Sequence, residues 1–270
     1  MLLSRRNLLW AAAAGCACKC TNSVSASFAF DRVRGAGRFT ATSVEEYVAY
    51  ESPEGGCYLL AHEAKQASDQ LTLFSSNDDK FTTGDAVLDS YLGKALVRTS
   101  KFMNVTPAFA FYDEENAQAS PDINPRVAGT WGTVLFGRPL FRKEMEVQDK
   151  TGLTVIAIIA HEFAHIHQYA LNLDKELLEG QPTVKRLELH ADILAGFFLG
   201  ARKREAPSLS MYSAGEVFNR IGDSKFTDRN HHGTPLERVS ASQFGFDRGR
   251  TGDYSLDTIV KEGVNYVKDL

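Results

Sequence analysis

Cysteine is scarce in this chain of 270 residues. Only four cysteines are present, and three of them, Cys16, Cys18 and Cys20, lie close together near the N-terminus. The fourth, Cys57, has no second cysteine to pair with in the rest of the chain, which excludes an internal disulfide framework there. We therefore expect stability to come from an ordinary hydrophobic core.

Long hydrophobic runs and an excess of positive charge are also missing. The longest apolar run after the leader, residues 153–160, is far shorter than the roughly 20 residues needed to span a bilayer, so we expect no transmembrane span in the mature chain. Thirty Lys and Arg residues are mixed with 34 Asp and Glu residues, for a net charge of -4. Without a basic stripe, a nucleic-acid partner is not expected.

The N-terminus has the pattern of an export signal. Arg5 and Arg6 precede a short apolar stretch, which is typical of a twin-arginine signal over residues 1–26 and predicts export from a bacterial cytoplasm. The sequence up to Cys16 resembles a lipoprotein box, and this would give a membrane-anchored lipoprotein with a lipid anchor at Cys16. Cleavage after Ala26 would instead release a periplasmic protein, and both alternatives stay open.

The most informative motif is His161-Glu162-Phe163-Ala164-His165. It lies in the apolar segment 153–171, whose length predicts a buried helix. On a helix, His161 and His165 share one face and can bind one metal ion, while Glu162 is placed beside a metal-bound water. Burying these groups is costly unless they are paired or bind a metal. The motif predicts one Zn²⁺ per chain.

A third ligand is expected downstream, in a helix that we predict to begin at Pro182. Glu188 and Asp192 are separated by one helical turn, so Glu188 can bind zinc while Asp192 accepts the free N–H of a liganding imidazole. His190 is the alternative third ligand. Helical geometry turns it roughly 200° away from Glu188, and we therefore favour Glu188.

Upstream of the motif, the pattern predicts a helix over residues 84–102 that packs on a small sheet. Strands are expected at Ala108–Tyr112 and Gly132–Phe136, with two further candidates at Phe39–Thr42 and Tyr58–Ala61.

The segment Trp131–Gly137 is predicted as an edge strand just before the active-site helix. At that position Thr133, Val134 and Leu135 would bind a peptide substrate by main-chain pairing. A buried interior strand is the alternative for this segment.

These motifs resemble those of the gluzincin metallopeptidases, in which HExxH is followed by a helix with a glutamate ligand. The E-x-x-A-D pattern of Glu188, Ala191 and Asp192 is similar to that of the bacterial neutral zinc metallopeptidases and of soluble relatives of the family containing the CAAX prenyl proteases and membrane heat-shock proteases. Segments Phe109–Pro121 and Thr130–Arg138 resemble the strands of those families.

The resemblance implies an α+β, zincin-like fold. In it, a small mixed sheet packs on the active-site helix and on a second, ligand-bearing helix. We expect residues 76–270 to form this metallopeptidase domain. Residues 27–75 are expected to be an N-terminal extension whose structure the sequence does not indicate.

The late segment His231-His232-Gly-Thr-Pro-Leu-Glu-Arg238 also resembles a motif of those families. There His232 would stabilise the oxyanion, with His231 as the alternative, and Arg238 would anchor the loop or bind a carboxylate such as Asp192. Glu162 would act as the general base.

Together, these features predict an exported zinc endopeptidase that acts on protein or peptide substrates. A catalytically idle zinc-binding envelope protein or chaperone-like module is the alternative, and an intact Glu162 disfavours it. A metallohydrolase acting on a non-peptide bond is a weaker third reading.

Overall fold

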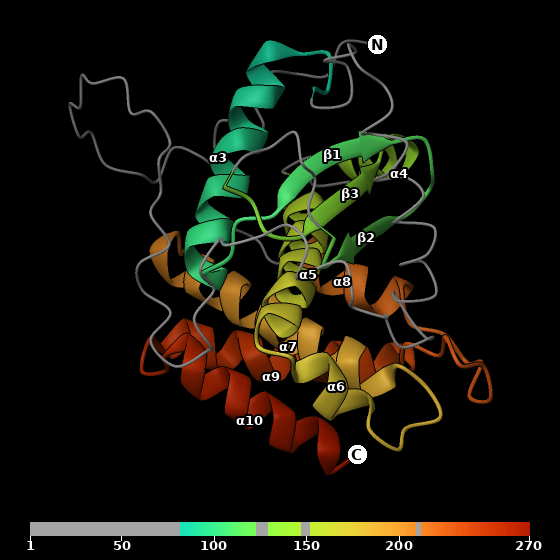
Figure 1. Ribbon diagram of the computed structural model, residues 1–270. Coiled ribbons are helices and arrows are strands. Elements are labelled where there is room, and N and C mark those ends of the chain that lie inside the picture. The colour runs from blue at the N-terminus through green and yellow to red at the C-terminus, as the bar shows by residue number, and fades with distance from the viewer. Residues whose placement is uncertain (1–81, 123–128, 147–151, 209–211) are drawn as a thin grey trace.

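The computed structural model describes residues 82–122, 129–146, 152–208 and 212–270. The predicted leader with Cys16, the extension 27–75 and its two candidate strands lie outside the described residues. The described part is a mixed α/β structure, mostly helical with one small sheet (Figure 1). This agrees with the predicted α+β class.

The sheet contains β1 (Ala108–Tyr112), β2 (Ala117–Ser120) and β3 (Thr133–Gly137) in the order β1-β3-β2. β1 pairs with β3 in parallel, whereas β2 pairs with β3 in the antiparallel direction. The sheet is therefore mixed, as predicted. β2 and β3 pack on the helix that carries the HExxH motif.

The predicted edge position of Trp131–Gly137 is wrong. β3 is the central strand, and Thr133, Val134 and Leu135 are paired to β1 on one side and to β2 on the other. All three residues are buried. Because both edges of β3 already carry ladder hydrogen bonds, these residues cannot pair with a peptide substrate by their main chain.

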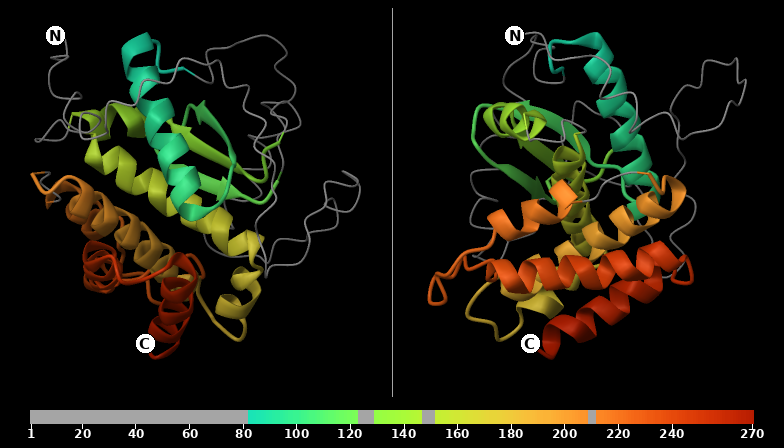
Figure 2. Two further views of the ribbon diagram at one scale, coloured as in Figure 1. Left: turned by 90° about the vertical axis from the view of Figure 1, so that its left-hand side faces the viewer. Right: turned by 180° about the vertical axis from the view of Figure 1, so that it is seen from behind.

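The helices are arranged in layers beneath the sheet, in the order α5, α7, then α9 with α10 (Figure 2). Their bounds are α3 (Ala86–Met103), α4 (Arg138–Met145), α5 (Leu153–Ala170), α6 (Leu173–Leu178), α7 (Lys185–Glu205), α8 (Tyr212–Arg220), α9 (Pro235–Thr251) and α10 (Leu256–Lys268). The helix predicted at 84–102 is present as α3. Its main contact is with α5, and Phe102 at its C-terminal end contacts the α7 rings of Phe197 and Phe198.

α5 is the central helix of the described fold. It begins directly after Gly152, which has a φ of 71° that favours glycine, and its side chains are buried on nearly every face. A helix that is apolar all round must be covered on all sides. Neighbours on several sides, including α3, α7, α8 and the sheet, provide that cover.

The N-termini of α7 and α9 differ: α9 has a side-chain cap, whereas α7 has none. α7 begins at Lys185, three residues after the predicted Pro182, which still places Glu188 in its first turn. α9 begins with a capping box, in which Thr234 and Glu237 satisfy each other's backbone N–H groups, followed by Pro235 at the first helical position. The start of α7 places Glu188 next to His161 and His165 of α5, and the start of α9 places Arg238 next to Asp192 of α7.

Glycines bring α7 and α9 unusually close together. Gly196 and Gly200 on α7 and Gly245 and Gly249 on α9 are each spaced by four residues, as in the Gly-x-x-x-Gly pattern that lets helix backbones meet. A methyl group on any of the four would lie about 2 Å from a carbonyl oxygen of the opposite helix. The two backbones are therefore in direct contact.

Among the described helices, none is both long enough and apolar enough to cross a membrane.

We expect Gly245→Ala to lower the free energy of unfolding by about 1–3 kcal/mol or more, the usual cost of overpacking. Its Cβ would lie 1.9 Å from the Ile193 carbonyl oxygen, and backbone atoms cannot move aside cheaply. The matched control is Gly93→Ala on α3, which meets nothing within 4 Å and should be neutral or stabilising by up to ~1 kcal/mol. Denaturant unfolding measures both, and equal stability of the two variants would contradict the close packing.

Candidate metal centre

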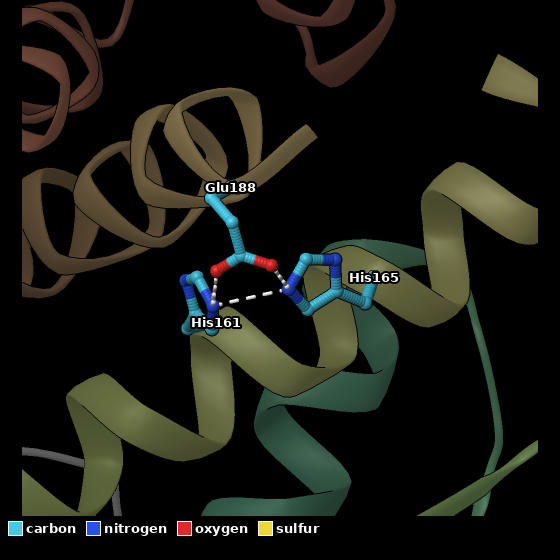
Figure 3. A group of neighbouring side chains, drawn as sticks. All are labelled: His161, His165 and Glu188. Atoms are coloured by element: carbon cyan, nitrogen blue, oxygen red, sulfur yellow. Dashed lines mark hydrogen bonds and ion pairs between the residues drawn. The ribbon is translucent and has the colours of Figure 1, made fainter. Parts of the chain in front are cut away.

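Three predicted ligands converge on one point. His161 and His165 lie one turn apart on α5, and Glu188 reaches them from the first turn of α7 (Figure 3). Their ligand atoms all lie within 4.8 Å of one another, and this is the group found among the described residues that could hold a metal ion.

The distances fit a tetrahedral ion. The two imidazole Nε2 atoms are 3.0 Å apart. Glu188 Oε2 lies 3.3 Å from His161 Nε2, and Glu188 Oε1 lies 3.4 Å from His165 Nε2. Ligand atoms at ~2.0–2.1 Å from a tetrahedral zinc would be about 3.3 Å apart. The two Glu188 distances belong to different carboxylate oxygens, of which a monodentate ligand uses one, and the three residues together could hold a metal ion of this size.

His190 is not part of this group. Its ring is fully buried, with Nδ1 3.0 Å from Gln168 Nε2 and Nε2 3.0 Å from the Val260 carbonyl oxygen. Burial lowers the pKa of His190 to about 4, so the ring is neutral at pH 7. His167 is buried as well, and neither histidine is solvent-facing.

Asp192 and Arg238 form a buried pair beside the cluster. His161 Nδ1 lies 2.9 Å from Asp192 Oδ1, so Asp192 is the neighbour that the spacing predicted, but the two atoms are not aligned for the predicted hydrogen bond. Arg238 donates two hydrogen bonds to the same carboxylate, from Nε at 2.7 Å and from Nη2 at 2.8 Å. Arg238 Nη2 also lies 3.5 Å from Glu188 Oε2. A bidentate pair of this kind fixes the carboxylate that orients His161.

The charges of the site are strongly coupled. Burial alone would raise the pKa of Glu188, but the nearby His165 and His232 rings and the contact with His161 hold that pKa well below its usual range. Burial would likewise lower the pKa of His161, yet Asp192 and Glu188 outweigh it and raise that pKa to about 10. The anionic groups of the site thus favour a cation between the imidazoles.

Glu162 lies next to the cluster without belonging to it. Its side chain is buried, and Oε2 has no hydrogen-bond partner within the described part of the chain. Burial raises the pKa of Glu162, while His161 and His165 oppose that rise. A buried carboxylate oxygen that has no partner among the described residues, beside three candidate ligand atoms, is available for proton transfer.

The two neighbouring histidines have different surroundings. His231 is held by Asp223, with Nδ1 2.6 Å from Oδ1, and its ring contacts Phe226. The His232 main-chain N–H donates to the other Asp223 oxygen, but its ring Nε2 is buried with no hydrogen-bond partner among the described residues. Burial lowers the pKa of His232, while Glu188 opposes this. Of the two rings, His232 is therefore the one whose pKa is influenced by the charge of Glu188 in the cluster.

Gln168 was not singled out from the sequence, although it lies in the same helix. Its Oε1 is 2.8 Å from His165 Nδ1, on the side of the ring away from the cluster. Its position three residues after His165 was the only signal in the sequence.

A cavity of about 840 Å³ lies elsewhere, between α3, α4, α5 and α7. It is lined mainly by apolar side chains such as Leu92, Phe141 and Ile156, and by none of the residues predicted for the site. It is separate from the candidate metal centre.

Comparisons of the chain with protein-family models, with curated proteins and with solved structures return no match. Function is therefore inferred from the chemistry of the site.

We expect zinc binding to release about one proton per ion at pH 7. In the metal-free protein His161 is protonated at that pH because its pKa is raised to about 10, and a metal ion must displace the Nε2 proton. Apparent affinity should accordingly rise with pH until about pH 10. Titration calorimetry in buffers of different ionisation enthalpy measures the proton count. Asp192→Asn removes one carboxylate that raises this pKa and should reduce the release, whereas a wild-type release of zero would contradict the assignment.

Proposed function

We propose that the protein is a zinc-dependent endopeptidase of the gluzincin type. The observation that carries this proposal is that Glu162, buried and with a free carboxylate oxygen, lies beside the His161, His165 and Glu188 cluster. Two imidazoles and one carboxylate are a donor set that zinc favours and that leaves a fourth position open for water.

The reaction assigns a role to each side chain. Zinc held by His161, His165 and Glu188 would supply a Lewis acid that polarises the scissile carbonyl and acidifies a water molecule. Glu162 takes the proton from the attacking water and delivers it to the amine nitrogen as the C–N bond breaks.

His232 completes the chemistry by donating its ring N–H to the carbonyl oxygen that becomes negative. Burial keeps this ring neutral at pH 7 by lowering its pKa, and a neutral imidazole retains one N–H donor. Arg238 and Asp192 act on the metal site by orienting His161, away from the substrate.

A peptide substrate would find its pairing strand in β2, not in β3. β2 is at the edge of the sheet and packs on α5, the helix that carries the motif. An extended peptide paired to an edge strand next to this helix would lie across the metal ligands. The residues of β2 are buried, so substrate entry requires the protein to open at this edge.

A zinc-binding protein without catalytic activity is the second candidate. The observation in its favour is that the cluster is closed, with His161 4%, His165 0% and Glu188 1% exposed. A structural metal site can be sealed from solvent, whereas a catalytic site must admit its substrate. The presence of Glu162 favours the peptidase, because a structural site needs no base.

The site of action follows from the leader alone. The twin-arginine-like segment at residues 1–26 supports export to the periplasm, with a lipid anchor where Cys16 is modified. Substrates would then be proteins or peptides of the cell envelope.

We expect Glu162→Gln to abolish casein cleavage, with a rate at least 10²-fold to 10⁴-fold lower, and to retain zinc. Glutamine has nearly the same size and cannot accept the proton, and Glu162 is not one of the three ligands. Cleavage rate and bound zinc are measured side by side for wild type and variant. If both proteins bind zinc and neither cleaves casein or a peptide library, the non-catalytic candidate replaces the peptidase.

We expect His232→Ala to lower kcat by about 10²-fold to 10³-fold with little change in KM, because it removes a donor used in the transition state. The control is His231→Ala, which loses the bond to Asp223 and should mainly lower the unfolding temperature. Steady-state kinetics on a fluorogenic peptide separate the two. A larger loss of kcat in His231→Ala would exchange the two roles.

A further inference from the structure

Gln168 occupies a fully buried position one turn after His165 on α5. Its Nε2 lies 2.9 Å from the Leu187 carbonyl oxygen, and a backbone carbonyl can only accept a hydrogen bond. This end of the side chain must therefore be the NH₂ group. The other end is the carbonyl oxygen, and it accepts from His165 Nδ1 at 2.8 Å.

The second proton of the same NH₂ group faces His190. Gln168 Nε2 is 3.0 Å from His190 Nδ1, which consequently acts as an acceptor. The proton of the His190 ring is then on Nε2, where it donates to the Val260 carbonyl oxygen at 3.0 Å. Backbone carbonyls at Leu187 and Val260 thus fix the direction of every hydrogen bond in this row.

These hydrogen bonds determine which ring nitrogen of His165 carries the proton. With its proton held at Nδ1 by Gln168, its Nε2 carries only a lone pair and faces His161 and Glu188. A neutral imidazole with the lone pair directed into the cluster is the form that binds a metal ion.

From these contacts we propose that Gln168 and His190 are positioning residues for the ligand His165, and that α10 belongs to the metal centre through the Val260 carbonyl. This inference rests on the proposed metal site. The two liganding histidines are then supported differently, His161 by the charged Asp192 and His165 by a neutral amide.

The neutral support suits the charge of the site. Asp192 is balanced by Arg238, and Glu188 and Glu162 together balance a divalent ion. A second buried carboxylate behind His165 would add an unbalanced negative charge, which is costly away from water. An amide orients the ring without that charge.

α10 holds His190 in place by contact as well as by the hydrogen bond. Gly263, one turn after Val260, lies so close that a Cβ there would be 2.9 Å from His190 Cδ2 and 3.1 Å from Nε2. A side chain at this position would tilt the ring away from Gln168. The docking of the C-terminal helix and the orientation of His165 are therefore coupled.

The first test measures zinc affinity of the full chain by competition with a chromophoric chelator. Gln168→Met keeps the volume but removes the acceptor, and we expect its zinc dissociation constant to rise about 10-fold to 100-fold, as for other residues that support metal ligands. Gln168→Glu restores an acceptor for His165, but it adds a buried negative charge and turns an oxygen toward the Leu187 carbonyl and His190 Nδ1, so it should recover only part of the lost affinity and should lower stability. Visible spectra of the Co²⁺-loaded proteins should show altered coordination in Gln168→Met only.

Stability of the metal-free proteins provides the readout that separates positioning from structure. A merely structural Gln168 would lower the unfolding temperature of both variants and leave the zinc affinity of the folded protein unchanged, which would overturn the inference. Absence of zinc binding by the wild type would instead overturn the proposed metal centre, and this inference with it.

The second test acts from α10. Gly263→Ala should weaken zinc binding by several fold although the residue contacts no ligand, while Gly93→Ala, in open space on α3, should not change it. This pair decides the question where Gln168→Met does not fold. Equal affinity of Gly263→Ala and Gly93→Ala would remove α10 from the metal centre.

Discussion

The described fold depends on keeping several charged and polar groups stable inside a helical core. α5 brings two imidazoles and a carboxylate to the most buried part of the molecule, where an unpaired charge would cost several kcal/mol. The Asp192 and Arg238 pair makes this tolerable, since it joins α7 to α9 and supports His161 at the same time. Loss of either partner would leave a buried charge uncompensated beside the cluster.

The close contact between α7 and α9 at their glycines allows the Asp192 and Arg238 pair to form. Arg238 is in the first turn of α9, and its guanidinium can reach Asp192 bidentately because the two backbones touch further along, at Gly196 and Gly245. Close helix packing is usually obtained with small residues, at the expense of side-chain burial. Here it allows one arginine to approach two carboxylates of the neighbouring helix, Asp192 at 2.7 Å and Glu188 at 3.5 Å.

The sequence predicted those parts of the site that follow from helical spacing within one segment. The period of a helix places His161 with His165 on one face of α5, and Glu188 with Asp192 on one face of α7. That the two pairs meet was expected from the need of a zinc ion for a third ligand, not from the period. The pairing of β3 could not be predicted in the same way, because the four residues Ala117–Ser120 have no β-branched or aromatic side chain to indicate a strand. Gln168 was missed because its partners Leu187 and His190 lie on α7, a helix that only the fold brings next to α5.

The closed cluster and the free oxygen of Glu162 have to be explained together. A buried acceptor without a donor costs about 1–3 kcal/mol, and native proteins tolerate few such groups. A structural metal site would gain nothing from this cost, since Glu162 is not among the three ligands. The unsatisfied carboxylate is explained if a water or substrate group takes that position during the reaction. Among the described residues, Nε2 of His232 and Oε1 of Glu188 are likewise buried without a hydrogen-bond partner. A metal ion would take up the Glu188 oxygen, whereas Glu162 and His232 are not ligands, and their unpartnered atoms favour a site that opens for substrate.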